Sequence, residues 1–302
     1  MSSTTSTALV LLYAFAAAAC ARDAQDGEEV APADTAVSAT TEAEAASALG
    51  AGGADAVTYE ATDFAFEGPA QIAAGVMSVR MANAGSVVHH VQLLRLEGEH
   101  SAADLQAALS GKGPDPEFPD WATPVGGPGA VLPGETTAAT VRLEPGRHAA
   151  VCMIPVPDGV PHVAKGMALD VEVVAADGNE ATLPEADATI GLRDYAFHMP
   201  APIASGSRTL RVTNGGTEPH ELQLFRMEPG KRLGDMMAWA QGGFQGPPPA
   251  TPLGGVTGIA PDAEATFTAD LEPGVYALVC FLPGPDGKLH LQLGMASEFE
   301  VG

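Results

Sequence analysis

Two segments of the chain each place a thiol, an imidazole and a thioether within sixteen residues. Segment 280–295 reads CFLPGPDGKLHLQLGM and segment 152–167 reads CMIPVPDGVPHVAKGM, so both fit the pattern C-x2-P-x-P-D-G-x2-H-x3-G-M. Their other positions differ freely, as Val160 and Lys288 show. A thiolate, two imidazoles and a weak axial thioether make a trigonal site that suits copper in electron transfer. The pattern therefore predicts a metal-binding loop in each segment, with a second imidazole supplied from elsewhere in the fold.

The second imidazole has a candidate in each half of the chain. Residues 63–93 align without gaps to residues 194–224 at an offset of 131, which sets His89 opposite His220. Each histidine follows an Asn-x-Gly stretch at the end of a run of alternating apolar and polar residues, which indicates a turn after a strand. We expect His89 to join the first loop and His220 the second.

These matches belong to an internal repeat. At an offset of 128, ATPVGG (122–127) meets ATPLGG (250–255), and LEPGRHAAVC (143–152) meets LEPGVYALVC (271–280). The repeat predicts two copies of one domain of about 120 residues. We place the first copy at 56–177 and the second at 186–302, with a boundary in the stretch DGNEATLPEA.

Within each copy the signals are those of strands. VMSVRMAN and RTLRVTN alternate apolar and polar residues, and HAAVC and VYALVC are short apolar runs after a Pro-Gly turn. Ser101 is suited to cap a helix over AADLQAALS, and a helix over LGDMMAWAQ would end at Gly242. The predicted fold class is all-β, with two tandem Greek-key β-sandwiches that each carry one short inserted helix.

With these features the sequence resembles the cupredoxins, the type 1 blue copper proteins. Cupredoxins are Greek-key β-sandwiches whose first His follows an N-x-G stretch, and whose Cys, second His and Met share one loop near the C-terminus. The resemblance spans about 63–173 and 194–301. It implies one copper per domain, and the ligands carried over by position are His89, Cys152, His162 and Met167 in the first copy and His220, Cys280, His290 and Met295 in the second.

One spacing departs from the family pattern. Nine residues separate the Cys from the loop His here, whereas cupredoxins usually have two to four. The inserted Pro-x-Pro-Asp-Gly favours a tight excursion that returns the His to the Cys. The alternative is a loop that leaves the His too far away for a blue copper geometry.

A purely structural interpretation also exists for each of these residues. Cys is often a small buried hydrophobe, Met fills cores, and a turn His can be satisfied by the backbone. The neighbouring His90 would face the opposite side of a strand, so we expect it at the surface. His100, His148 and His198 have no His counterpart in the other copy, and we expect them to be solvated.

The N-terminus resembles a targeting signal. Residues 8–19 form an apolar run too short to span a bilayer, and Ala17-Ala18-Ala19-Cys20 resembles a bacterial lipobox. We predict a lipoprotein signal peptide over 1–20, lipid on Cys20, and an acidic disordered linker over 21–55. The protein would then be tethered to a membrane in the extracytoplasmic cell envelope. A plain secretory signal or a disordered apolar tail is the alternative.

The chain is strongly acidic. Its 302 residues carry a formal net charge of -24, which disfavours nucleic acid as a partner because phosphates would be repelled. The charge is compatible with a basic redox partner, although an acidic surface is more often simply solvated. Cys152 and Cys280 are repeat equivalents expected in separate sandwiches, so metal binding explains them better than a disulfide would.

Three functions agree with this sequence. The first is an anchored electron carrier with one copper in each copy and a redox partner protein. The second is a metal-free cupredoxin-like module that binds a protein or a small ligand. The third is a protein that holds copper without a role in electron transfer. We expect no enzyme activity, because no His-x-His or His-Cys-His motif occurs in the chain.

Overall fold

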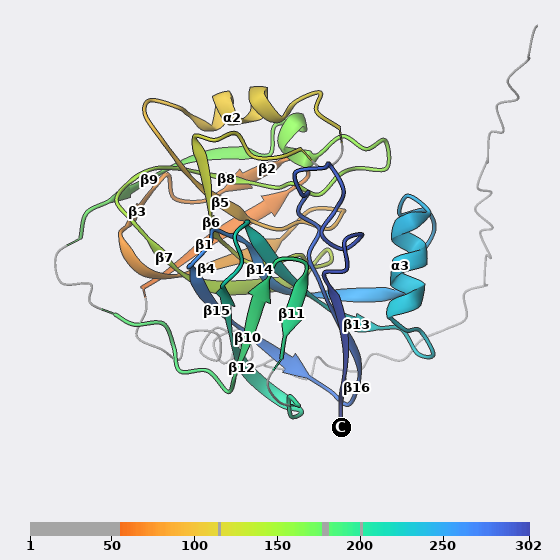
Figure 1. The fold of residues 1–302 in the computed structure, drawn as a ribbon. Coiled ribbons are helices and arrows are strands. Elements are labelled where there is room, and N and C mark those ends of the chain that lie inside the picture. The colour runs from red at the N-terminus through yellow and green to blue at the C-terminus, as the bar shows by residue number, and fades with distance from the viewer. Residues whose placement is uncertain (1–54, 114–115, 177–180, 200–201) are drawn as a thin grey trace, which may run out of the picture. The chain divides into compact units, whose positions relative to one another are not determined.

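The structure is a computed structural model that describes residues 55–113, 116–176, 181–199 and 202–302. The predicted signal peptide, Cys20 and the predicted linker up to residue 54 lie outside the described residues. The described part is built mainly from β-strands (Figure 1).

The strands follow the alternation that the sequence predicts. In the first strand, Val57, Tyr59 and Ala61 are buried and the residues between them are exposed. The first copy forms β1 (Asp55–Thr62), β2 (Ala65–Glu67), β3 (Gln71–Ala73), β4 (Gly75–Asn83), β5 (Gln92–Leu96), β6 (Ala122–Gly126), β7 (Thr136–Leu143), β8 (Gly146–Val151) and β9 (Ala168–Val174). The second copy forms β10 (Ala188–Arg193), β11 (Ala196–His198), β12 (Gly206–Asn214), β13 (His220–Met227), β14 (Ala250–Ile259), β15 (Glu264–Leu271), β16 (Gly274–Val279) and β17 (Ala296–Val301).

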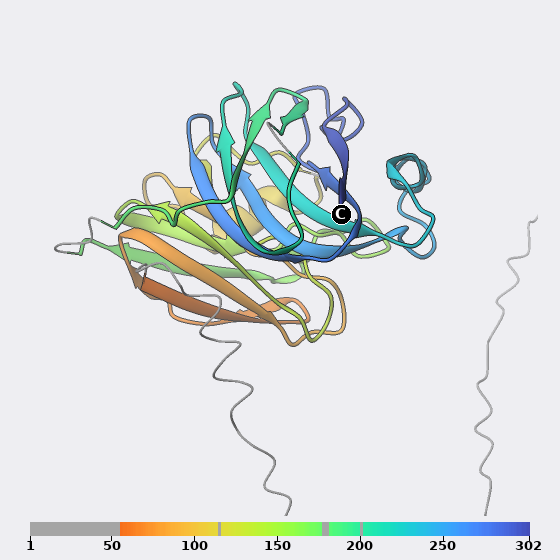
Figure 2. The ribbon, with the colours of Figure 1, turned by 90° about the horizontal axis from the view of Figure 1, so that it is seen from below.

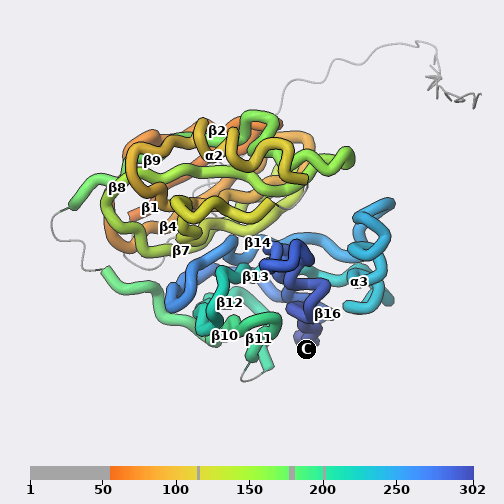
Figure 3. Tube along the Cα trace, turned by 45° about the horizontal axis from the view of Figure 1, so that its top comes forward, coloured from red at the N-terminus to blue at the C-terminus, as the bar shows by residue number. Residues whose placement is uncertain are grey.

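The strands form two sheets, and each sheet runs through both copies. The order is β11-β10-β12-β15-β7-β4-β1-β2 in one and β17-β16-β13-β14-β6-β5-β8-β9-β3 in the other. The copies meet where equivalent strands pair antiparallel, β7 with β15 and β6 with β14. Ala139 pairs with Phe267, its own equivalent at the offset of 128, so the copies are related by a local two-fold axis at this pair. Figures 2 and 3 show the orange-to-green strands of the first copy beside the blue strands of the second.

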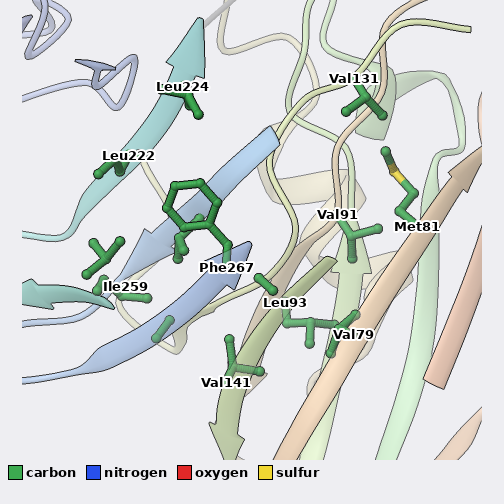
Figure 4. Close-up of a cluster of buried hydrophobic side chains, with 14 of the residues drawn as sticks. Val79, Met81, Val91, Leu93, Val131, Val141, Leu222, Leu224, Ile259 and Phe267 are labelled. Carbon is green, nitrogen blue, oxygen red and sulfur yellow. The ribbon is translucent and has the colours of Figure 1, made fainter. Parts of the chain in front are cut away.

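Reciprocal hydrogen bonds and a shared core join the copies. Gln92 Nε2 donates to the carbonyl of Gly258 at 3.0 Å, while the equivalent Gln223 accepts at Oε1 from the amide of Ala130 at 2.9 Å. One buried hydrophobic cluster contains side chains of both copies, with Phe267 and Ile259 facing those of the first copy (Figure 4). Because the apolar contacts are continuous, the two copies should unfold together.

Each copy carries the predicted short helix. Helix α2 (Ala102–Leu109) begins after Ser101, whose side chain caps the amide of Asp104 while Asp104 accepts from the Ser101 amide. Helix α3 (Leu233–Gln241) ends at Gly242, as predicted. A third, 3-10 helix, η1 (His162–Lys165), begins at the loop histidine of the first copy. Among the described residues, no helix is both long and apolar enough to cross a membrane.

Candidate metal centres

The nine residues between Cys and His fold into a compact excursion in both copies. In the first copy Pro155 bridges Pro161, and the amide of Val163 donates to the carbonyl of Cys152 at 2.8 Å. In the second, Pro283 bridges Leu289, and the amide of Leu291 donates to the carbonyl of Cys280 at 2.9 Å. The loop thus leaves the strand, turns at Asp-Gly and returns the His beside the Cys, so the longer spacing does not separate them.

The first copy brings His89, Cys152 and His162 together. Cys152 Sγ lies 3.4 Å from His162 Nδ1 and 3.9 Å from His89 Nδ1, and the two Nδ1 atoms are 3.2 Å apart. All three residues are buried. We call these residues the first centre.

The second copy repeats this arrangement with His220, Cys280 and His290. Cys280 Sγ lies 3.4 Å from His290 Nδ1, and the Nδ1 atoms of the two histidines are 3.0 Å apart. The ligand atoms of the three residues lie within 4.8 Å of one another, and all three residues are buried. We call these residues the second centre.

Met167 and Met295 each lie close to the cysteine of their own centre. Met167 and Met295 are fully buried and belong to the same hydrophobic cluster as the cysteines. The amide of Cys152 donates to the carbonyl of Met167 at 3.3 Å, and that of Cys280 to the carbonyl of Met295 at 3.2 Å. These backbone contacts bring each Met residue next to its Cys.

A carboxylate orients the upstream histidine in each centre. His89 Nε2 lies 3.3 Å from Asp63 Oδ1, and His220 Nε2 lies 3.0 Å from Asp194 Oδ1. Holding Nε2 in this way leaves Nδ1 free to face the cysteine, and a hydrogen bond on the far nitrogen commonly fixes a metal-ligating imidazole in this manner. Asp63 and Asp194 were not among the predicted site residues, but they begin the aligned segments 63–93 and 194–224, so the internal repeat is a signal that points to them.

The Asn-x-Gly turn has a steric role. Asn83 Nδ2 donates to the carbonyls of Val87 and Val131, which ties the turn to the chain beyond it. A Cβ atom on Gly85 would lie 2.7 Å from His89 Nε2 and 2.6 Å from Asp63 Oδ1. Gly216 is equally confined, at 2.7 Å from His220 Nε2 and 2.4 Å from Asp194 Oδ1. Only glycine therefore allows the turn, the histidine and the aspartate to approach so closely.

Burial keeps the thiols and most of the imidazoles of the centres in their neutral forms. Burial raises the pKa of the Cys152 thiol to about 12 and raises that of Cys280 well above its ordinary value. Burial also lowers the pKa of His162 to about 4 and lowers those of His89 and His290. Two neutral imidazoles and a thiol that must lose its proton form a soft nitrogen and sulfur donor set, which fits copper.

An aromatic residue packs on the loop histidine in both centres, but its own partner differs. An aromatic ring stands edge-on to it in both, Phe64 at 5.1 Å from His162 and Tyr195 at 5.2 Å from His290 between ring centroids. Both aromatic residues have positive φ, 67° and 64°, which is a strained conformation for a bulky side chain. Tyr195 also donates its hydroxyl to Glu218, whereas Val87 stands at the equivalent place in the first copy.

The prediction for His90 is wrong. This side chain is buried, and its Nε2 accepts a hydrogen bond from the amide of Met153 at 2.8 Å. In the second copy the equivalent Glu221 accepts a hydrogen bond from the amide of Phe281 at 2.8 Å. Strand alternation failed here because the chain is irregular around His89, where only an isolated bridge is formed.

The other histidines differ in how far they are exposed to solvent. His148 was expected to be solvated but is buried on β8, with Nδ1 held by the carbonyl of Gly146 at 3.0 Å. His100 stacks on Trp121 at 4.0 Å between ring centroids, and His198 is exposed as expected. Cys152 and Cys280 are both free and buried.

Solved structures of copper proteins show a distant similarity to this chain. Auracyanin A, a "blue" copper protein from Chloroflexus aurantiacus, matches 40% of this chain over 99% of its own, at 20% identity and a TM-score of 0.30. A Cu-containing nitrite reductase from Thermus scotoductus matches 82% of this chain over 61% of its own, at 13% identity and a TM-score of 0.23. The blue copper oxidase of Nitrosomonas europaea matches 82% of this chain over 85% of its own, at 15% identity and a TM-score of 0.22. No protein-family model matches the chain, and no curated protein matches its sequence.

The prediction that this protein is not an enzyme is contradicted. The structure assembles a His/Cys/His group in each copy, and the matching structures include oxidases and a nitrite reductase. The prediction relied on contiguous motifs, but the first centre draws its residues from positions as far apart as 89 and 162. The missing motif therefore excludes no oxidase-type chemistry.

The fold class, the repeat and the donor sets together give one description. The chain is an all-β protein of two repeated units, each with a buried His/Cys/His group that fits one copper ion.

Proposed function

We propose that this protein binds one copper ion in each centre and transfers electrons through them. The ligands would be His89, Cys152, His162 and Met167 in the first centre and His220, Cys280, His290 and Met295 in the second. Copper bound there would accept and release one electron at a time. The observation that carries the proposal is the convergence of two Nδ1 atoms and one Sγ in a buried pocket, twice in one chain.

The residues around each centre support electron transfer in particular. Fast transfer requires a site that moves little when its charge changes, because every rearrangement adds to the barrier. Here Asp63 or Asp194 fixes one imidazole, and the excursion between Cys and His is closed by backbone hydrogen bonds. Burial of the thiol and both imidazoles keeps water from reorganising at the centre.

Copper titration of the purified full-length chain tests this proposal. We expect two Cu(II) per chain and a strong visible thiolate-to-copper absorption that reduction bleaches reversibly. Cys152→Ser and Cys280→Ser should each remove about half of the absorption, and the double variant all of it. Full absorption in both single variants would overturn the ligand assignment. Copper that binds but neither reduces reversibly nor exchanges electrons with a carrier would indicate a copper-holding role instead.

We further propose that the protein acts on the outer side of a bacterial membrane, attached through lipid on Cys20. The apolar segment 8–19 and the Ala-Ala-Ala-Cys sequence support this proposal, and the acidic stretch that follows would serve as a tether. Cys20→Ser should move the protein from the membrane fraction to the soluble fraction. Unchanged fractionation of that variant would contradict lipid attachment.

A further inference from the structure

A groove of about 340 Å³ opens beside the second centre, and both copies contribute to its walls. Residues 117–120 of the first copy form one side, and Glu218, Leu282 and His290 of the second copy form the other. A volume of this size suits a small organic ligand. Many of its lining residues are prolines, which hold the walls in a preformed shape.

The groove is negatively charged. Glu117, Asp120 and Glu218 line it, and no Lys or Arg is among its lining residues. Phe118 and Leu282 add apolar surface between the carboxylates. The lining therefore selects a ligand that has a positive charge and an apolar body.

His290 connects this groove to the second centre. Its Nδ1 faces Cys280 at 3.4 Å, and its ring belongs to the groove lining. Its Nε2 is buried and lies 3.2 Å from Glu218 Oε2, a carboxylate of the groove wall. Glu218 therefore connects the groove to the imidazole that reaches the second centre.

A metal ion is a poor match for the groove. Among the described residues, the groups of three or more His, Cys, Asp or Glu side chains whose ligand atoms converge within 4.8 Å are the two centres themselves. The three carboxylates of the groove therefore do not meet at one point. They surround a space that a larger cation with delocalised or shielded charge would fill.

We propose that the groove binds a small organic cation with an aromatic or similarly apolar body, which donates electrons to the second centre across His290. The electron-transfer part rests on the proposed function, whereas the binding part does not. One electron leaves the cation and reduces the copper of the second centre, with no bond made or broken and no proton moved. The first centre lacks this feature, since Val87 replaces Glu218.

Calorimetric titration of the metal-free full-length chain tests binding separately from redox chemistry. The probe is (ferrocenylmethyl)trimethylammonium, and ferrocenylmethanol is its neutral counterpart. We expect one molecule of the cation to bind per chain, more tightly than the alcohol and more weakly as salt is raised. The double variant Glu117→Gln/Asp120→Asn should lower the affinity for the cation by about three- to tenfold and leave the affinity for the alcohol unchanged.

A matched control separates a local effect from total charge. Glu60→Gln/Glu67→Gln removes the same charge from two exposed positions outside the groove and should leave binding unchanged. Equal affinity for the cation and the alcohol, or an equal loss in the control variant, would overturn the proposal. So would saturable binding of a basic peptide with no binding of the ferrocenyl cation, because the groove would then belong to a protein partner.

Stopped-flow mixing of the copper-loaded Cys152→Ser variant with the probe tests electron donation. We expect the second centre to be reduced with a rate that saturates in probe concentration, and Glu117→Gln/Asp120→Asn should raise the half-saturating concentration. A rate unchanged by that double variant would overturn the proposal while leaving copper binding intact. Failure to bind copper at all would refute the proposed function, and the calorimetric result would still decide whether the groove binds cations.

Discussion

The two centres have the same donor atoms but different surroundings. Around the first, Phe64 and Val87 are apolar and His90 is neutral, because burial lowers the pKa of His90 to about 3. Around the second, the equivalent residues are Tyr195, Glu218 and Glu221. The donor set was kept in both copies while the charge beside it was changed.

Position 90/221 shows which property is required there. His90 and Glu221 each accept a hydrogen bond from the amide that follows the cysteine, at 2.8 Å in both copies. The geometry of the loop therefore needs a buried acceptor, but not one particular residue type. A carboxylate brings negative charge and a neutral imidazole does not, so the two centres can share a structure and still hold copper at different potentials.

The largest expected effect is a loss of copper affinity at one centre, caused by a change in the Asn-x-Gly turn that both copies share. Gly85→Ala and Gly216→Ala should each lower copper affinity of their own centre by about 100-fold, because the added methyl group overlaps a histidine and its aspartate. Copper titration monitored by visible absorption measures this effect. Gly234→Ala, where nothing lies within 4 Å of the added atom, is the control. A normal absorption in Gly85→Ala would show that the turn does not position His89.

Acid should destabilise the metal-free chain through its buried histidines, of which His90 and His148 occur only in the first copy. Burial lowers the pKa of His90 to about 3 and lowers that of His148, whereas Glu221 and Tyr276 occupy these positions in the second copy. Below pH 6.5 the unfolded chain binds protons that the folded chain does not. Each group then costs about 1.4 kcal/mol of unfolding free energy per pH unit until its folded pKa is reached.

Urea unfolding of the metal-free chain at pH 7, 6 and 5 measures that cost. Stability should fall as pH falls, and His90→Gln with His148→Tyr should make the dependence less steep, although His89, His162 and His290 still contribute. An equally steep loss in this double variant would mean that other groups cause it.

The charge at position 221 should decide which of the two centres has the lower reduction potential. Negative charge beside Cys280 stabilises the more highly charged Cu(II), so the second centre should have the lower potential and pass electrons to the first. Glu221→Gln should raise the potential of the second centre by about 50–150 mV, since a tenfold change in a one-electron equilibrium is about 59 mV. Spectroelectrochemistry on the Cys152→Ser background measures it. His90→Gln on the Cys280→Ser background is the control, and equal shifts in both would dismiss charge as the cause.

The smallest effect concerns the aromatic residue over the loop histidine. Tyr195→Phe copies the first centre into the second and removes the hydrogen bond to Glu218, which should cost about 1 kcal/mol of unfolding free energy. Phe64→Tyr should gain no such stability, because Val87 offers no carboxylate. Urea unfolding compares the two variants. A gain in Phe64→Tyr equal to the loss in Tyr195→Phe would show that Glu218 is irrelevant to this contact.

The sequence alone determined the donor sets and the strand-rich fold. An internal repeat is a comparison that needs no second protein, and it separated the shared Cys, His and Met positions from their variable neighbours. Alternating apolar residues predicted strands, and Ser101 before AADLQAALS predicted the start of a helix. These features are local, so the residue types along the chain suffice to determine them.

The tertiary structure decided how these parts meet. Only the fold shows that the long excursion returns His162 to Cys152 and that equivalent strands join the copies into continuous sheets. It also buries His90 and sets Asp63 against His89, neither of which strand alternation predicted. The predicted absence of enzyme activity failed for the same reason, since a His/Cys/His group can form in space without a contiguous motif. Contacts between residues far apart in the chain depend on packing of whole sheets, which no local pattern encodes.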